Sequence, residues 1–177
     1  MEGIMKRFLV VVDMQNDFID GALGSAEAQA IVPKVVEKIK SYPDDCIIAT
    51  RDTHESDYLQ TSEGKYLPVE HCIKGTKGWE IREEVSLVMP KALLVDKPTF
   101  GSTQLVRLLQ SEYANEEIEI ELVGLCTDIC VVTNALLLKT GLPDVKISVD
   151  GSCCAGVTPE SHAAALLTMK MCQVEVL

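Results

Sequence analysis

Two cysteines lie where a predicted buried strand gives way to a helix, in the stretch ELVGLCTDICVVTNALLLK. Cys126 follows the break at Gly124, and Cys130 falls in the first turn of the predicted helix. Free backbone N–H groups and the positive end of the helix dipole favour a thiolate there. Cys130 is therefore a candidate nucleophile, although a free cysteine packed against a sheet is also typical of this position.

The spacing and number of the cysteines restrict the other chemistry open to them. The C-x-x-x-C spacing differs from the C-x-x-C of thiol redox motifs, and a zinc site would need further ligands. The adjacent Cys153 and Cys154 do not offer that geometry. Seven cysteines, an odd number without the spacing of a small disulfide scaffold, predict reduced thiols in a cytoplasmic protein.

Charged side chains follow other predicted strands. Asp13 ends the strand RFLVVVD, Asp52 and His54 follow CIIAT, and Lys97 follows ALLVD. In an open parallel sheet, ligands bind beyond the carboxyl ends of the strands. We therefore expect a carboxylate, a lysine and a cysteine to converge on one rim. Taken alone, Asp13 is also typical of a turn, and Lys97 of a surface lysine.

A long polar segment after the second strand carries two of the three histidines. The motif RDTH places Asp52 and His54 on the same side of an extended chain, as two metal ligands should be. His71 is a candidate third ligand, and Glu63, between the histidines, is a candidate fourth. The alternative is that the histidines hydrogen-bond the loop backbone. A polar loop of this length in a compact domain is usually functional.

Short β-branched runs alternate with longer helical patterns along the whole chain, which predicts βαβ units. We expect one α/β domain over residues 1–177, a three-layer arrangement with a mostly parallel six-stranded sheet between helices. Thr158, Pro159 and Glu160 form a helix start, and Gly141 ends the preceding helix. Pro33 either opens a helix or kinks a longer one. The predicted strands are RFLVVVD, CIIAT, ALLVD, IEIELVG, VKISVD and CQVEVL, and the helices lie near IVPKVVEKIKSY, GSTQLVRLLQSEY, TDICVVTNALLLKTG and TPESHAAALLTMKM.

Composition excludes several classes of partner. The 177 residues are 47% hydrophobic and carry a net charge of −11. Nucleic acids and anionic membranes require a basic face, so neither is expected as a partner. The amino-terminal run MEGIMKRFLVVVDMQ fits a strand better than a signal peptide, and no stretch has the length of a membrane span.

Five motifs in order, VVDMQNDF, RDTH, VEHCIKGTKGWE, DKPTFGS and GLCTDICV, resemble the cysteine hydrolases of the isochorismatase-like superfamily. The resemblance runs from about Phe8 to the last helix and is nearest to nicotinamidase-related amidohydrolases. It implies a Rossmann-like fold with strand order 3-2-1-4-5-6. It also implies hydrolysis of a small carboxamide, with nicotinamide as the leading substrate, and a dimeric or tetrameric assembly.

The resemblance assigns roles around the nucleophile. It implies a catalytic triad of Asp13, Lys97 and Cys130. It further implies a cis peptide bond between Leu125 and Cys126, with the N–H groups of Cys126 and Cys130 forming an oxyanion hole. On this interpretation Cys126 acts through its backbone.

The resemblance also assigns a role to the polar loop. It implies that Asp52, His54 and His71 bind a divalent metal ion, with Glu63 matching an extra ligand of some nicotinamidases. Zinc is the first expectation, and iron and manganese are the alternatives.

Two positions depart from typical nicotinamidases. Leu67 stands where a tryptophan usually precedes the proline, and Phe100 alone follows the triad lysine. We expect Phe18, Phe100 and Leu125 to contact the substrate, whereas Trp79 fits either a pocket wall or the core. The open alternatives are an amidohydrolase of carbamoyl or ureido compounds, a thiol-redox protein, and a non-catalytic protein on this fold.

Overall fold

Six parallel strands form one sheet in the order β3-β2-β1-β4-β5-β6, as predicted. The computed structural model describes residues 5–113 and 117–177. All six predicted strands form, although β5 extends further than expected and β6 is short. The strands are β1 (Lys6–Val12), β2 (Ile47–Asp52), β3 (Leu93–Lys97), β4 (Ile118–Leu125), β5 (Lys146–Ala155) and β6 (Glu175–Val176).

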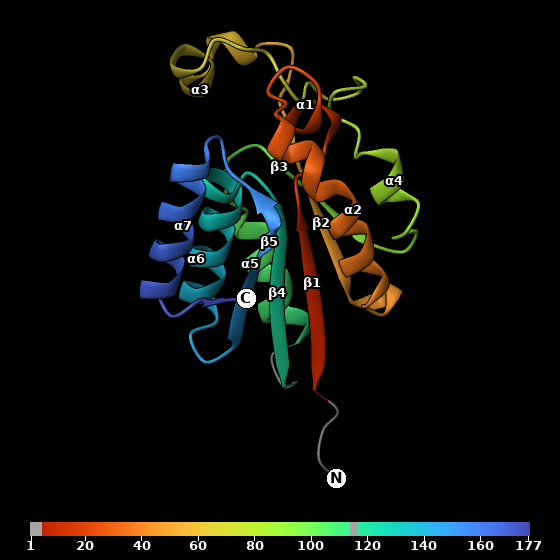
Figure 1. Ribbon diagram of the computed structural model, residues 1–177, viewed down its shortest axis with the longest axis vertical. Coiled ribbons are helices and arrows are strands. Elements are labelled where there is room, and N and C mark those ends of the chain that lie inside the picture. Colours follow the sequence, from red (N-terminus) through yellow and green to blue (C-terminus); the bar gives the residue numbers. More distant parts are fainter. Residues whose placement is uncertain (1–4, 114–116) are drawn as a thin grey trace.

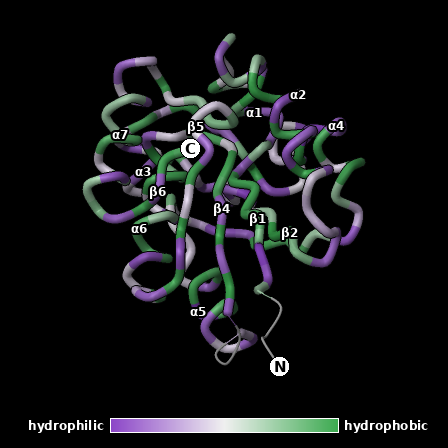
Figure 2. Tube along the Cα trace, turned by 60° about the horizontal axis from the view of Figure 1, so that its bottom comes forward, coloured by the Kyte–Doolittle hydropathy of each residue, from purple (hydrophilic) through white to green (hydrophobic). Residues whose placement is uncertain are grey.

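Helices cover both faces of the sheet, which confirms the three-layer prediction (Figure 1). The helices are α1 (Asn16–Ile19), α2 (Ala26–Lys40), α3 (Ser62–Tyr66), α4 (Glu83–Ser86), α5 (Thr103–Glu112), α6 (Val132–Gly141) and α7 (Pro159–Met171). One core cluster joins the sheet to α5, α6 and α7, and the other joins it to α1, α2 and α4. Hydrophobic and hydrophilic stretches alternate around α2 and α5, as expected for helices with one face on a sheet (Figure 2).

Local signals set most helix ends. The Thr158 side chain accepts a hydrogen bond from the Ser161 N–H, and Pro159 occupies the first turn of α7. Helix α6 ends at Gly141, as predicted. Pro33 lies inside α2, which begins earlier, after Ser25 accepts a hydrogen bond from the Ala28 N–H. None of the helices in residues 5–113 and 117–177 combines the length and apolarity that crossing a bilayer requires.

Gly124 lets strands β1 and β4 approach each other closely, six positions before the candidate nucleophile Cys130. Its φ of +119° lies in the region that side chains other than glycine rarely adopt. A Cβ at this position would approach the Val12 carbonyl oxygen to 2.1 Å. Glycine therefore permits the carboxyl ends of β1 and β4 to pair, which places Asp13 and Cys126 at one rim.

Candidate active site

Asp13, Lys97 and Cys130 meet beyond the carboxyl ends of β1, β3 and β4. The Lys97 Nζ lies 2.6 Å from Asp13 Oδ2 and donates to the Cys130 Sγ at 3.4 Å. All three side chains are buried, with Asp13 0% and Lys97 1% exposed. The Thr50 hydroxyl donates to Asp13 Oδ1 at 2.7 Å. Topology therefore brings together a carboxylate, an ammonium group and a thiol, as the strand ends indicated.

Burial sets the protonation of this cluster. It raises the pKa of the Cys130 thiol well above its ordinary value, and the Asp13 charge adds to the effect, while Lys97 opposes it. Desolvation therefore acts against the thiolate that the helix start favours. Burial also raises the pKa of Asp13, against the pull of Lys97. Burial therefore weakens the acidity of the Cys130 thiol and increases the basicity of the Asp13 carboxylate beside it.

Lys97 remains charged although it is buried. Burial alone would lower the pKa of Lys97, but the negative charges of Asp13 and Asp52 beside it raise it above its ordinary value. The Nζ also lies 3.6 Å from Asp52 Oδ1. Lys97 thus stands between the Asp13 carboxylate and the polar loop that carries Asp52.

The segment that carries Cys130 begins as a π-helical turn, η3 (Thr127–Val131), where an α-helix was predicted. The Cys126 carbonyl oxygen accepts from the N–H groups of Ile129 at 3.1 Å and Val131 at 3.0 Å. In a regular α-helix this oxygen would accept from Cys130. The expected cis peptide bond is present between Leu125 and Cys126.

Asn134, which sequence reasoning missed, fixes the turn after the nucleophile. Its Nδ2 donates to the Cys130 carbonyl at 2.8 Å and the Phe100 carbonyl at 3.1 Å, while its Oδ1 accepts from the Ser102 N–H. Asn134 is fully buried on α6. A polar residue four positions after the nucleophile, on a largely apolar helix, is the signal that could have identified it.

Asp52, His54, Glu63 and His71 form one cluster of potential metal ligands, whose ligand atoms all lie within 4.8 Å of one another. His54 Nε2 lies 2.9 Å from Asp52 Oδ2, and His71 Nε2 lies 3.4 Å from the same oxygen. His71 Nδ1 contacts the Val69 carbonyl oxygen at 2.8 Å, which turns Nε2 toward the cluster. Two ring nitrogens and two carboxylates fit a divalent zinc, iron or manganese ion.

Buried polar residues hold the ligand loop in place. Gln15 donates to the carbonyl oxygens of Asp52 and Trp79 and accepts from the Asp52 N–H, so it joins the two ends of the loop. The buried Tyr58 ring packs 4.7 Å from His54 and 5.0 Å from His71, and its hydroxyl donates to the Leu67 carbonyl. Sequence reasoning assigned no role to Gln15 or Tyr58.

A cavity of about 450 Å³ opens beside the thiol and the ligand cluster. All three predicted substrate contacts, Phe18, Phe100 and Leu125, line it, whereas Cys130 itself does not. Trp79 packs partly buried in the core, with Arg51 over its ring, and is outside this lining. The lining consists of Phe18, Leu23, Gly24, Ser25, Ala28, Glu63, Tyr66, Leu67, Phe100, Leu125, Cys126, Ile129, Gly156 and Val157.

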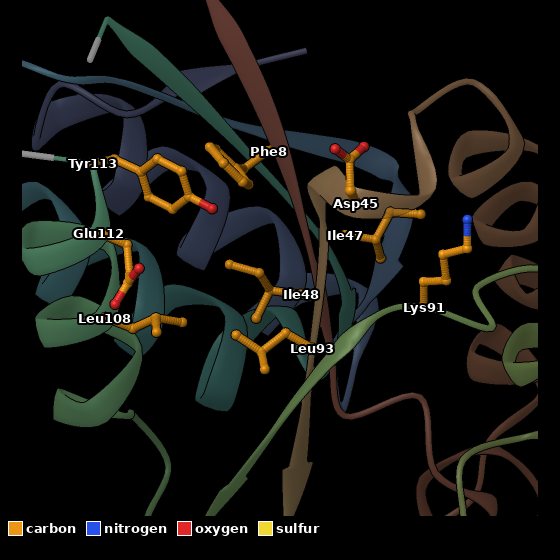
Figure 3. Close-up of a pocket in the computed structure, with 9 residues that line it drawn as sticks. All are labelled: Phe8, Asp45, Ile47, Ile48, Lys91, Leu93, Leu108, Glu112 and Tyr113. Carbon is orange, nitrogen blue, oxygen red and sulfur yellow. The ribbon is translucent and has the colours of Figure 1, made fainter.

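A second hollow, of about 280 Å³, lies at the amino ends of β1, β2 and β3 (Figure 3). Its lining includes Asp45, Lys91 and Glu112 among apolar side chains. None of the predicted site residues contributes to it. The predicted triad and ligand residues therefore lie at the opposite, carboxyl edge of the sheet.

Comparison with known proteins agrees with this geometry. The nicotinamidase/pyrazinamidase of Mycobacterium tuberculosis is 27% identical, over 96% of this chain and 97% of its own. An Arabidopsis thaliana protein named "probable inactive nicotinamidase" is 29% identical, over 92% of this chain and 87% of its own. The crystal structure of the pyrazinamidase of Pyrococcus horikoshii in complex with zinc is 26% identical, with a TM-score of 0.76 over 97% of this chain and 98% of that one.

The isochorismatase domain model matches residues 7–177, which is nearly the whole chain. The match spans all six strands except the first residue of β1, and it includes the triad and ligand positions. The chain therefore belongs to the isochorismatase family, among the cysteine hydrolases related to nicotinamidases.

Proposed function

We propose that this chain hydrolyses a small carboxamide, with nicotinamide as the first candidate, to a carboxylate and ammonia. The observation that carries the proposal is the buried contact of Asp13, Lys97 and Cys130 beside the ligand cluster. The relatives named for nicotinamide and pyrazinamide hydrolysis support it.

In the proposed mechanism Asp13 accepts the thiol proton as Cys130 attacks the amide carbonyl. Because burial raises the pKa of the Cys130 thiol, the attack requires such a base, and the raised pKa of Asp13 suits it to the task. Asp13 then protonates the departing ammonia, which leaves a thioester on Cys130. Water attacks the thioester with Asp13 again as base, and the carboxylate and free thiol are released. Lys97 keeps Asp13 oriented throughout.

The N–H groups of Cys126 and Cys130 are proposed to bind the oxyanion. In support, the Cys126 carbonyl accepts from Ile129 and Val131 and so omits the intervening Cys130 N–H. One donor of this kind typically contributes about 100- to 1000-fold to the rate.

Asp52, His54, Glu63 and His71 would hold the proposed metal ion. A bound divalent ion supplies a Lewis acid that can fix a ring nitrogen or orient water. Glu63 also lines the cavity, so the cluster borders the space where the substrate would lie. The burial of Asp52, His54 and His71 limits competition from bulk water.

We expect about one divalent ion per chain in protein purified without added metal or chelator. Replacing His54 and His71 together by Ala should remove it, because both ring nitrogens face the cluster. His162→Ala is the matched control, since His162 contacts Thr127 and does not belong to the ligand cluster, so this variant should keep the metal content unchanged. Elemental analysis of the three proteins decides, and equal metal content in the double variant would contradict the assignment.

Metal-loaded, reduced protein should release ammonia from nicotinamide, and nicotinaldehyde should inhibit it by forming a thiohemiacetal with Cys130. Steady-state turnover of nicotinamide, pyrazinamide, a ureido acid and a carbamoyl amino acid is the measurement. If nicotinamide is not hydrolysed while the ureido acid turns over well, the proposed substrate becomes a carbamoyl or ureido compound. Absence of turnover throughout the panel would favour a non-catalytic protein, an alternative that the Arabidopsis relative's name brings forward.

A further inference from the structure

The cavity beside Cys130 contains neither a lysine nor an arginine. Glu63 is the ionisable carboxylate of its lining, and the remaining walls are mainly apolar side chains, glycines and the Cys126 thiol. Lys97, the cation nearest the chemistry, is buried against Asp13 at 2.6 Å and cannot also pair with a substrate. A separate groove that shares Gly156 carries Lys34, but Glu27 lies in the same groove. A carboxylate on the part of the substrate that lies against Leu67, Phe100 and Val157 would therefore be buried without a protein cation to pair with, which is strongly disfavoured.

The cavity is also large for a one-ring amide. A cavity of roughly 150 Å³ accommodates benzene, whereas this one measures about 450 Å³. A single pyridine ring would thus leave much of the apolar wall in contact with water. An apolar substituent on the ring would cover that wall.

The mouth of the cavity offers further apolar contact. Leu67 is 37% exposed, Phe100 45% and Val157 62%. The Asp128 carboxylate accepts from the Val157 N–H at 3.1 Å, which fixes one side of the mouth. Leu67, at this mouth, is smaller than the tryptophan that the resemblance leads one to expect there.

From these observations we infer that the preferred substrates are uncharged aromatic carboxamides larger than nicotinamide, with an apolar ring substituent seated between Leu67, Phe100 and Val157. The inference rests on the proposed amide hydrolysis and narrows its substrate class.

The size of the substrate is tested with nicotinamides that bear hydrogen, methyl or propyl at ring carbon 5 or 6. Full burial of one methylene raises affinity about fourfold, so the better propyl compound should exceed nicotinamide in kcat/KM by about tenfold or more.

The preference for an uncharged substrate is tested with 5-carboxynicotinamide and its methyl ester, which are similar in size. The ester should release ammonia readily and the acid at least about 100-fold more slowly. Equal rates for either comparison would overturn the inference while leaving amide hydrolysis intact.

The position of the substituent is tested at Leu67. Leu67→Trp should lower the propyl-to-hydrogen ratio of kcat/KM by about tenfold, because the indole fills the mouth. Leu59→Trp is the matched control, since Leu59 is 48% exposed in the same loop segment but lies outside the cavity lining. It should leave the ratio unchanged, and an equal shift in both variants would refute the placement.

Binding to the Cys130→Ala variant separates this inference from the proposed function. The propyl compound should bind at least about tenfold more tightly than nicotinamide, measured by calorimetry on metal-loaded protein. Tight binding without turnover by the wild-type protein would contradict amide hydrolysis and retain the ligand class. Equal or weaker binding of the propyl compound would overturn the ligand class.

Discussion

Cys130→Ala should lower kcat/KM for amide hydrolysis by about 10⁴-fold or more, because no thioester can form without the sulfur. The fold should remain intact, since the substitution removes one buried atom from a large core cluster. Ammonia release and the thermal unfolding midpoint, measured on the same preparation, test both statements.

Cys154→Ala provides the matched control for that loss. Cys154 and Cys130 are each 4% exposed and belong to the same core cluster. The Cys154 variant should therefore lose similar stability but keep its activity. Cys126→Ala should also retain most activity, because the proposed role of Cys126 lies in its backbone. A Cys130→Ala protein that still hydrolyses amides at the wild-type rate would remove the proposed mechanism.

Asp13→Asn is expected to reduce kcat by about 10²- to 10⁴-fold, the usual contribution of a positioned acid–base group. Asparagine suits this position because Asp13 has a φ of 46°, which asparagine tolerates better than most residues. Its amide oxygen can still accept from the Thr50 hydroxyl. The loss would thus reflect the missing proton acceptor rather than a rearranged backbone.

The same Asp13→Asn substitution should lower the pKa of the Cys130 thiol, even though it slows hydrolysis. The Asp13 charge raises the pKa of Cys130, whereas Lys97 lowers it. Removing the Asp13 charge leaves Lys97 to pair with a thiolate at the 3.4 Å contact, so the pKa of Cys130 should fall. Iodoacetamide labelling of Cys130, followed by mass spectrometry across pH, should show a midpoint at lower pH in the variant. An unchanged or higher midpoint would mean that Asp13 does not act on this thiol.

The sequence pattern by itself determined the parallel sheet and the rim that carries the candidate site, and the resemblance to a known family supplied the strand order. Alternating β-branched and helical runs predict a parallel sheet, and its geometry gathers strand-end residues such as Asp13 and Lys97 at one edge. Helix starts such as Thr158–Pro159 are equally readable, because their hydrogen bonds join residues close in sequence. The five motifs added the expected triad and the expected metal ligands. The structure brings the triad residues into contact and the four ligand residues into one cluster.

Tertiary structure alone decided the electrostatics and the shape of the site. Whether Cys130 is a thiol or a thiolate depends on burial by segments distant in sequence, and here that burial raises the pKa of the thiol. Thr50, Gln15 and Asn134 support the site through hydrogen bonds to residues distant in the sequence. Sequence spacing does not predict these bonds, and the bond from Asn134 to Cys130 is the exception. The width and apolarity of the cavity likewise arise from packing between α1, α2, α3 and η3, because a pocket exists only where several distant elements fail to fill the space between them.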